Sequence, residues 1–173
     1  MAKDFQPTYK NVHEDIERYL TAIGKRQKTP DGFIVFRGYD DARDLMFKLY
    51  LEKCAYEPLV NWLRVWNWEN NYNNFLLTLT EELSRRQHWI HLKRLWDGVL
   101  AKRRGAYNAV WKIMKKEPDA LPPRHLERAK GLLLESLERT KNFAQSFGAA
   151  EDVSACAKII ERVEEGKKPR IRR

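Results

Sequence analysis

Lysine, arginine and aromatic residues are concentrated in residues 85–116, which carry ten bases but a single acid, Asp97. Cationic side chains neutralise phosphates and carboxylates, while aromatic rings and guanidinium groups stack on unpaired bases. This composition is typical of a surface that binds an anionic partner. The aromatic residues of the segment are Trp89, Trp96, Tyr107 and Trp111.

Net positive charge occurs in only two stretches of the sequence. Residues 85–116 sum to +9 and residues 166–173 to +5, whereas residues 1–84 and 117–165 sum to −2 and −3. A solvated helix surface, with cations near helix C-termini, is the alternative interpretation of the first stretch. We call the following residues the basic face: Arg85, Arg86, Arg94, Lys102, Arg103, Arg104, Lys112, Lys115 and Lys116. Further contacts are expected from the C-terminal tail residues Lys167, Lys168, Arg170, Arg172 and Arg173.

Histidines offer weaker candidates for chemistry. His88 and His91 are three residues apart and would share one face of a helix, as paired metal ligands do. Zinc needs a third and usually a fourth ligand, and no cysteine or acidic cluster lies nearby at ligand spacing. We therefore predict no metal site. His13 and His125 are isolated in the sequence, and we expect both to be exposed.

The chain carries no catalytic signature. It contains no GxSxG, no glycine-rich phosphate loop and no HExxH motif. The clustered acids Asp40, Asp41 and Asp44 are explained by the first turn of a helix, where carboxylates are favoured. We therefore predict no catalytic residues, no cofactor and a protein that is not an enzyme, with an enzyme of unrecognised type as the remaining alternative.

Composition indicates a folded protein. Of the 173 residues, 43% are hydrophobic and 33% are charged, a balance that permits a buried core. No apolar run approaches the roughly 20 residues that cross a bilayer, and Met1–Phe5 lacks an apolar signal core. Cys54 and Cys156 form no CxxC pair, so we expect two reduced core cysteines and a cytoplasmic protein without membrane insertion.

Apolar residues recur at helical spacing along most of the chain. Gly24 and Gly148 follow two of these stretches as caps, and Asp40 and Asp41 are expected to cap and begin the second helix. Asn67–Asn74 is polar and indicates a turn between helices. The predicted helices cover about residues 12–23, 40–54, 58–66, 72–83, 89–104, 109–116, 123–147 and 153–163.

Phe33–Phe36 is the only stretch with a β-like composition, and Asp31-Gly32 and Gly38 flank it. A single strand cannot make a sheet. We expect an extended segment packed on helices, with an edge offered to a partner as the alternative. Lys25–Pro30, just before it, is interpreted as a polar connector.

Short connectors between helices favour antiparallel neighbours. We predict an all-α fold of stacked antiparallel helical hairpins or an irregular helical bundle, with one short extended segment near 33–36. Residues 1–165 are expected to form a single helical domain, with a subdivision near 117–123 left open, and residues 166–173 a disordered basic tail. Trp89 and Trp96 coincide with the apolar stripe of Leu92 and Val99, so we expect both rings in the core.

Residues 72–104 resemble a helical hairpin of the tetratricopeptide-like α-solenoids, with Tyr72 at the leading aromatic position of that family. The small-residue positions of the family then fall on Leu76, His88 and Leu95, and no 34-residue repeat runs along the chain. The resemblance implies a concave surface that binds peptides or serves as an adaptor. It assigns no binding residues here.

These observations favour a non-enzymatic helical interaction or adaptor module whose basic face, flanked by aromatic residues, binds an acidic protein segment. The alternative is a helical protein that binds RNA or single-stranded DNA, as a subunit of a nucleoprotein complex, with the same cations and the tail on phosphates.

Overall fold

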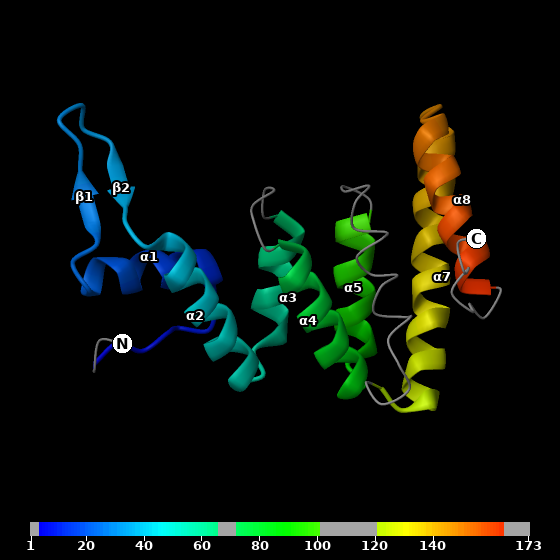
Figure 1. Ribbon diagram of the computed structural model, residues 1–173, viewed down its shortest axis with the longest axis horizontal. Coiled ribbons are helices and arrows are strands. Elements are labelled where there is room, and N and C mark those ends of the chain that lie inside the picture. The colour runs from blue at the N-terminus through cyan, green and yellow to red at the C-terminus, as the bar shows by residue number, and fades with distance from the viewer. Residues whose placement is uncertain (1–3, 66–71, 101–120, 165–173) are drawn as a thin grey trace, which may run out of the picture. The chain divides into compact units, whose positions relative to one another are not determined.

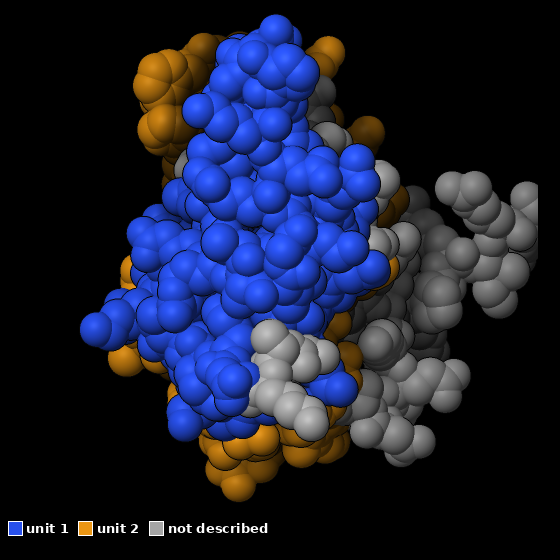
Figure 2. Space-filling model, turned by 90° about the vertical axis from the view of Figure 1, so that its left-hand side faces the viewer, with its two compact units in different colours: residues 1–66 blue, residues 67–173 orange. Residues whose placement is uncertain are grey.

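The computed structural model describes residues 4–65, 72–100 and 121–164 (Figure 1). The chain divides into two compact units, residues 1–66 and residues 67–173, which Figure 2 colours separately. Within the described ranges the secondary structure is seven α-helices and one two-stranded sheet, which confirms the predicted all-α fold. Most of the stretch 117–123, where a subdivision was left open, lies outside the described residues.

Three helices form the core of unit 1: α1 (Val12–Ala22), α2 (Tyr39–Glu52) and α3 (Tyr56–Val65). Helix α1 begins at Asn11, whose side-chain oxygen accepts a hydrogen bond from the Glu14 N–H. Helix α2 begins one residue earlier than predicted, because Gly38 with φ of 71° is its N-cap and Asp40 and Asp41 lie in the first turn. Fully buried apolar side chains from all three helices pack together, among them Ile16, Leu20, Met46, Leu59 and Leu63.

The segment Phe33–Phe36 pairs with the preceding connector, which corrects the prediction that it packs alone on helices. Strand β1 (Arg26–Lys28) runs antiparallel to β2 (Ile34–Phe36), with Gln27 opposite Val35. The turn between the strands has proline and glycine where a type I turn with a bulge favours them, and Gly32 has φ of 86°. The Gly32 N–H donates to the Thr29 carbonyl at 2.9 Å. The hairpin therefore depends on its turn, since both strands are largely exposed.

Unit 2 contains α4 (Tyr72–Arg85), α5 (Trp89–Leu100), α7 (Pro123–Ser146) and α8 (Ala150–Glu164). Residues 86–88 join α4 to α5, and residues 147–149 join α7 to α8, so each pair forms a helical hairpin (Figure 1). Asn73 and Asn74, which the predicted turn 67–74 and the predicted helix 72–83 both include, lie in the first turn of α4. The predicted helix at 109–116 and the tail at 166–173 lie outside the described residues.

Two side chains of α5, Trp96 and Asp97, fasten this helix to its neighbours in unit 2. The Trp96 indole N–H donates to Thr80 Oγ1 of α4 at 3.3 Å. Asp97 accepts hydrogen bonds from Ser136 Oγ at 2.8 Å and from an Arg139 guanidinium nitrogen at 2.6 Å, both on α7. Helix α5 is therefore held from both sides by polar contacts as well as by apolar packing.

Two side chains at the ends of helices are exposed, and one of them, Cys54, was predicted in the core. Phe147, the last residue of the predicted helix 123–147, is the C-cap of α7 and 72% of it is exposed. Cys54 is exposed and has φ of 57°, because it follows the last turn of α2, whereas Cys156 is buried as predicted. Among the described helices, none is long and apolar enough to span a bilayer.

Candidate anion-binding site

Three residues of the basic face lie in the described structure: Arg85, Arg86 and Arg94. Arg85 forms ion pairs with Glu81 at 2.8 Å and with Glu82 at 3.2 Å. Arg86 pairs with Glu82 as well. Both arginines remain about half exposed, at 51% and 53% of their side chains, so the contacts are surface ion pairs of modest strength.

The remaining residues of the basic face, and all of the tail cations, lie outside the described residues: Lys102, Arg103, Arg104, Lys112, Lys115, Lys116, Lys167, Lys168, Arg170, Arg172 and Arg173.

Asp97, the only acid in residues 85–116, is occupied by α7. Its carboxylate accepts from Arg139, a cation outside that segment, and from Ser136. The ion pair between Arg139 and Asp97 joins side chains that are 46% and 34% exposed. Asp97 is therefore paired with Arg139 of α7 and not with a cation of residues 85–116. The net charge of residues 85–116 stays at +9.

A cavity of about 320 Å³ lies in unit 2 where α5 and α7 begin. Its walls hold two guanidinium groups, a carboxamide and two nitrogen-containing rings, and no carboxylate occurs among its lining residues. A space with that lining carries a positive potential and favours an anionic group. The lining residues are Gln87, Trp89, Pro122, Arg124, His125 and Arg128.

Trp89 and His125 meet at the wall of this cavity. Their ring centroids are 6.2 Å apart and the planes are 85° to each other, an edge-to-face arrangement. Both residues are half-buried, so Trp89 is not the core residue that was predicted and His125 is not exposed. His125 Nδ1 is buried and, within the part of the chain that the structure describes, has no hydrogen-bond partner.

Arg124 lies in the first turn of α7, where a helix least favours cations, and Arg128 lies one turn later; both are exposed. Helix α7 begins with Pro122 as N-cap and Pro123 in the first turn, and this first turn holds no acid. Helix N-termini favour negative groups. The two arginines are also four residues apart, so like charges share one helix face. In the described residues no ion pair joins either arginine to an acid.

A larger cavity in unit 1, about 610 Å³, has balanced charges. It lies between α1 and the β1–β2 hairpin, with Glu14 and Glu17 on its wall beside Arg18 and Arg26. Two acids and two bases leave no preference for the sign of a ligand. The cavity at the start of α7 therefore differs from this one in the charge of its lining, which has two arginines and no acid.

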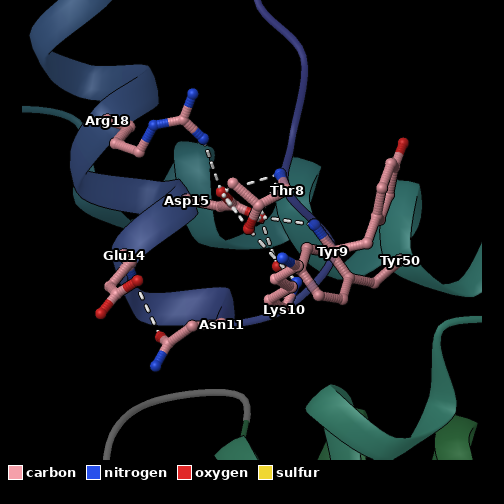
Figure 3. A network of polar contacts seen from close by, with 8 residues as sticks. All are labelled: Thr8, Tyr9, Lys10, Asn11, Glu14, Asp15, Arg18 and Tyr50. Carbon is pink, nitrogen blue, oxygen red and sulfur yellow. Dashed lines mark hydrogen bonds and ion pairs between the residues drawn. The ribbon is translucent and has the colours of Figure 1, made fainter.

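Asp15 is the centre of a polar network in unit 1 (Figure 3). Its carboxylate is fully buried and accepts from the Thr8 N–H at 3.0 Å, the Tyr9 N–H at 3.1 Å and the Tyr50 hydroxyl. Arg18 adds an ion pair at 2.9 Å. The network fastens the segment before α1 to α1 and α2.

The titration of this network indicates a structural role. Burial raises the pKa of Asp15, but the hydrogen bonds from Tyr50, Thr8 and Tyr9 outweigh it, so the pKa lies below its usual value. Burial, followed by the hydrogen bond to Asp15 and its charge, raises the pKa of Tyr50. A buried carboxylate that is fully hydrogen-bonded has no free lone pair for general base catalysis.

Other clusters of titratable groups are also engaged. Asp40 and Asp44 of α2 form ion pairs with the buried Arg43 at 3.1 Å and 3.3 Å. The His88 and His91 rings are 5.8 Å apart and edge to face. Across residues 4–65, 72–100 and 121–164, no group of three or more histidine, cysteine or acidic residues is arranged to hold a metal ion.

Comparison of the chain with protein-family models, with curated proteins and with solved structures finds no match.

Proposed function

We propose that the protein is a non-enzymatic helical interaction module that binds an acidic protein segment through the basic face. The observation that carries the proposal is the local charge of residues 85–116, which reaches +9. Asp97, the only acid there, is already counted in this sum, and its ion pair is with Arg139 of another helix. A local excess of this size attracts an anionic partner and orients it.

The ion pairs of α4 divide the basic face into two parts. Arg85 and Arg86 already interact with Glu81 and Glu82, so a partner must displace these contacts to bind there. We assign the main binding contribution to the part of the basic face that its sequence makes richest in cations, Lys102 to Lys116. The hairpin of α4 and α5 carries the described part of the basic face, Arg85, Arg86 and Arg94, and residues 72–104 resemble a tetratricopeptide-like hairpin.

Reversing three charges of the basic face tests the proposal. We expect Arg94→Glu, Lys102→Glu and Arg104→Glu together to weaken binding of an oligoglutamate peptide by about 100-fold, because each reversal costs about 1 kcal/mol in a solvated contact. Fluorescence anisotropy of labelled peptide at low salt measures the affinity. Circular dichroism should show an unchanged helical signal.

A matched control variant tests whether the position of the charges, and not only the net charge, determines the affinity for the peptide. Lys25→Glu, Arg26→Glu and Lys28→Glu reverse three exposed cations at the hairpin of unit 1 and lower the net charge equally. We expect this variant to bind the peptide with nearly wild-type affinity. Equal losses in the two triple variants would show that only net charge matters and would overturn the assignment to the basic face.

Salt dependence distinguishes the acidic segment from a nucleic acid. A nucleic-acid complex should lose affinity with a slope of almost one in log salt for each contacted phosphate. We expect the oligoglutamate peptide to bind more tightly than single-stranded RNA at physiological salt. Binding of RNA with a steep salt slope, together with no measurable peptide binding, would replace the proposal by the nucleic-acid alternative.

A further inference from the structure

We propose that the cavity at the start of α7 is a binding site for a single oxyanion, and that its occupant is a carboxylate of the acidic segment. The inference rests on the proposed function for the source of the carboxylate, but the site itself stands on separate residues. None of its lining residues belongs to the basic face.

The side chains that line the cavity have the chemistry of an oxyanion site. Arg124 and Arg128 carry planar guanidinium groups that match the two oxygens of a carboxylate or a phosphate. Gln87 contributes a carboxamide whose N–H groups also donate to oxygen. No lining residue is acidic, so a bound anion would meet no carboxylate in the wall of the cavity.

One ring atom beside the cavity has no hydrogen-bond partner in the described structure. His125 Nδ1 has almost no accessible surface and no partner there, although buried polar atoms are nearly always hydrogen-bonded. The ring lines the cavity, so a turn of the ring toward the cavity would let a protonated Nδ1 donate to an oxygen of the anion. Trp89 packs edge to face against the same ring.

The start of α7 also favours an anion. Arg124 lies in the first turn and opposes the positive end of the helix, and Arg128 lies four residues on, so the two like charges share one helix face. An oxyanion between the two arginines would offset both repulsions. The local sequence is therefore unfavourable for the free protein and favourable for an anionic complex, which is the pattern expected of a binding site.

Titration with small anions tests the site directly. We expect acetate and inorganic phosphate, added separately to the full chain, to shift the NMR signals of the Trp89 indole N–H and of the Arg124 and Arg128 Nε–H groups. In a variant with Arg124→Gln and Arg128→Gln, the affinity for both anions should fall about tenfold. His125→Phe keeps a ring against Trp89 and should weaken binding about threefold.

A control removes equal charge from the same unit. Lys158→Gln and Arg162→Gln alter α8, outside the cavity, and should leave the affinity for acetate and phosphate unchanged. The absence of any shift with either anion, or equal losses in both double variants, would overturn the site. Shifts with phosphate but none with acetate would overturn the carboxylate as occupant.

The same variants separate this inference from the proposed function. In the first outcome, reversal of Arg94, Lys102 and Arg104 weakens the binding of oligoglutamate, but Arg124→Gln with Arg128→Gln does not. This outcome would overturn the cavity as part of the peptide site and would keep the basic face. Acetate binding in the cavity, without any binding of the peptide, would overturn the proposed function and keep the oxyanion site. We expect both sets of substitutions to weaken peptide binding.

Discussion

Replacing Trp96 by alanine is expected to lower the free energy of unfolding by about 3–5 kcal/mol. The ring is fully buried, and its indole N–H donates to Thr80 Oγ1 of α4. Alanine would leave a cavity between α4 and α5 and remove the partner of a buried hydroxyl. Urea unfolding of the full chain, followed by circular dichroism, measures the change in the transition that includes unit 2.

Two further variants test whether the loss of stability comes from the buried Trp96 side chain. Trp96→Phe keeps an apolar ring but loses the hydrogen bond, and should cost less than alanine. Ile90→Ala removes an apolar side chain from the same helix, but Ile90 is 77% exposed and should change the stability by less than about 0.5 kcal/mol. Near wild-type stability of Trp96→Ala would contradict the burial of this ring in the core.

Long amphipathic helices could be predicted from the sequence because their apolar period is unambiguous. Residues 123–147 were predicted as one helix, and its apolar stripe through Ala129, Leu133 and Leu137 is buried, with Pro122 and Pro123 at the start of α7. Gly24 and Gly148, the predicted caps, both have positive φ. Local signals therefore determine where these helices begin and end.

The hairpin of unit 1 was missed because its first strand carries no hydrophobic signal. Arg26–Lys28 is polar and exposed, so periodicity alone could not identify a strand there. The turn sequence Thr29-Pro30-Asp31-Gly32 was the available signal, since proline and Asp-Gly at these positions are typical of a tight turn. Turn chemistry, rather than strand composition, indicates this element.

The candidate sites were predictable to different degrees. The ion pairs of Arg85 and Arg86 follow from the sequence, because Glu81 and Glu82 precede them by four residues on one helix. The cavity at the start of α7 could not be derived in this way, since Trp89 and His125 come from separate helices. Its one local signal was Arg124 and Arg128 in place of acids at a helix N-terminus.

Asparagine at position 15 is expected to destabilise the protein by roughly 3 kcal/mol at neutral pH, because Asp15→Asn removes a buried charge that accepts several hydrogen bonds. The amide would also set N–H groups against the donors of Thr8 and Tyr9. Glu14→Gln, an exposed acid of the same helix, is the matched control and should have a small effect. Urea unfolding of the full chain measures both variants.

The pH dependence of the stability difference between wild type and Asp15→Asn tests whether the charge of Asp15 is its cause. The pKa of Asp15 is lowered in the folded state, so its contribution is fully present above the unfolded value of about 3.9 and is lost as the pH falls through the folded pKa. The stability gap between wild type and Asp15→Asn should therefore be constant near neutrality and shrink in acid. A gap that stays unchanged below pH of about 3 would mean that shape, not the charge of Asp15, holds the segment before α1 in place.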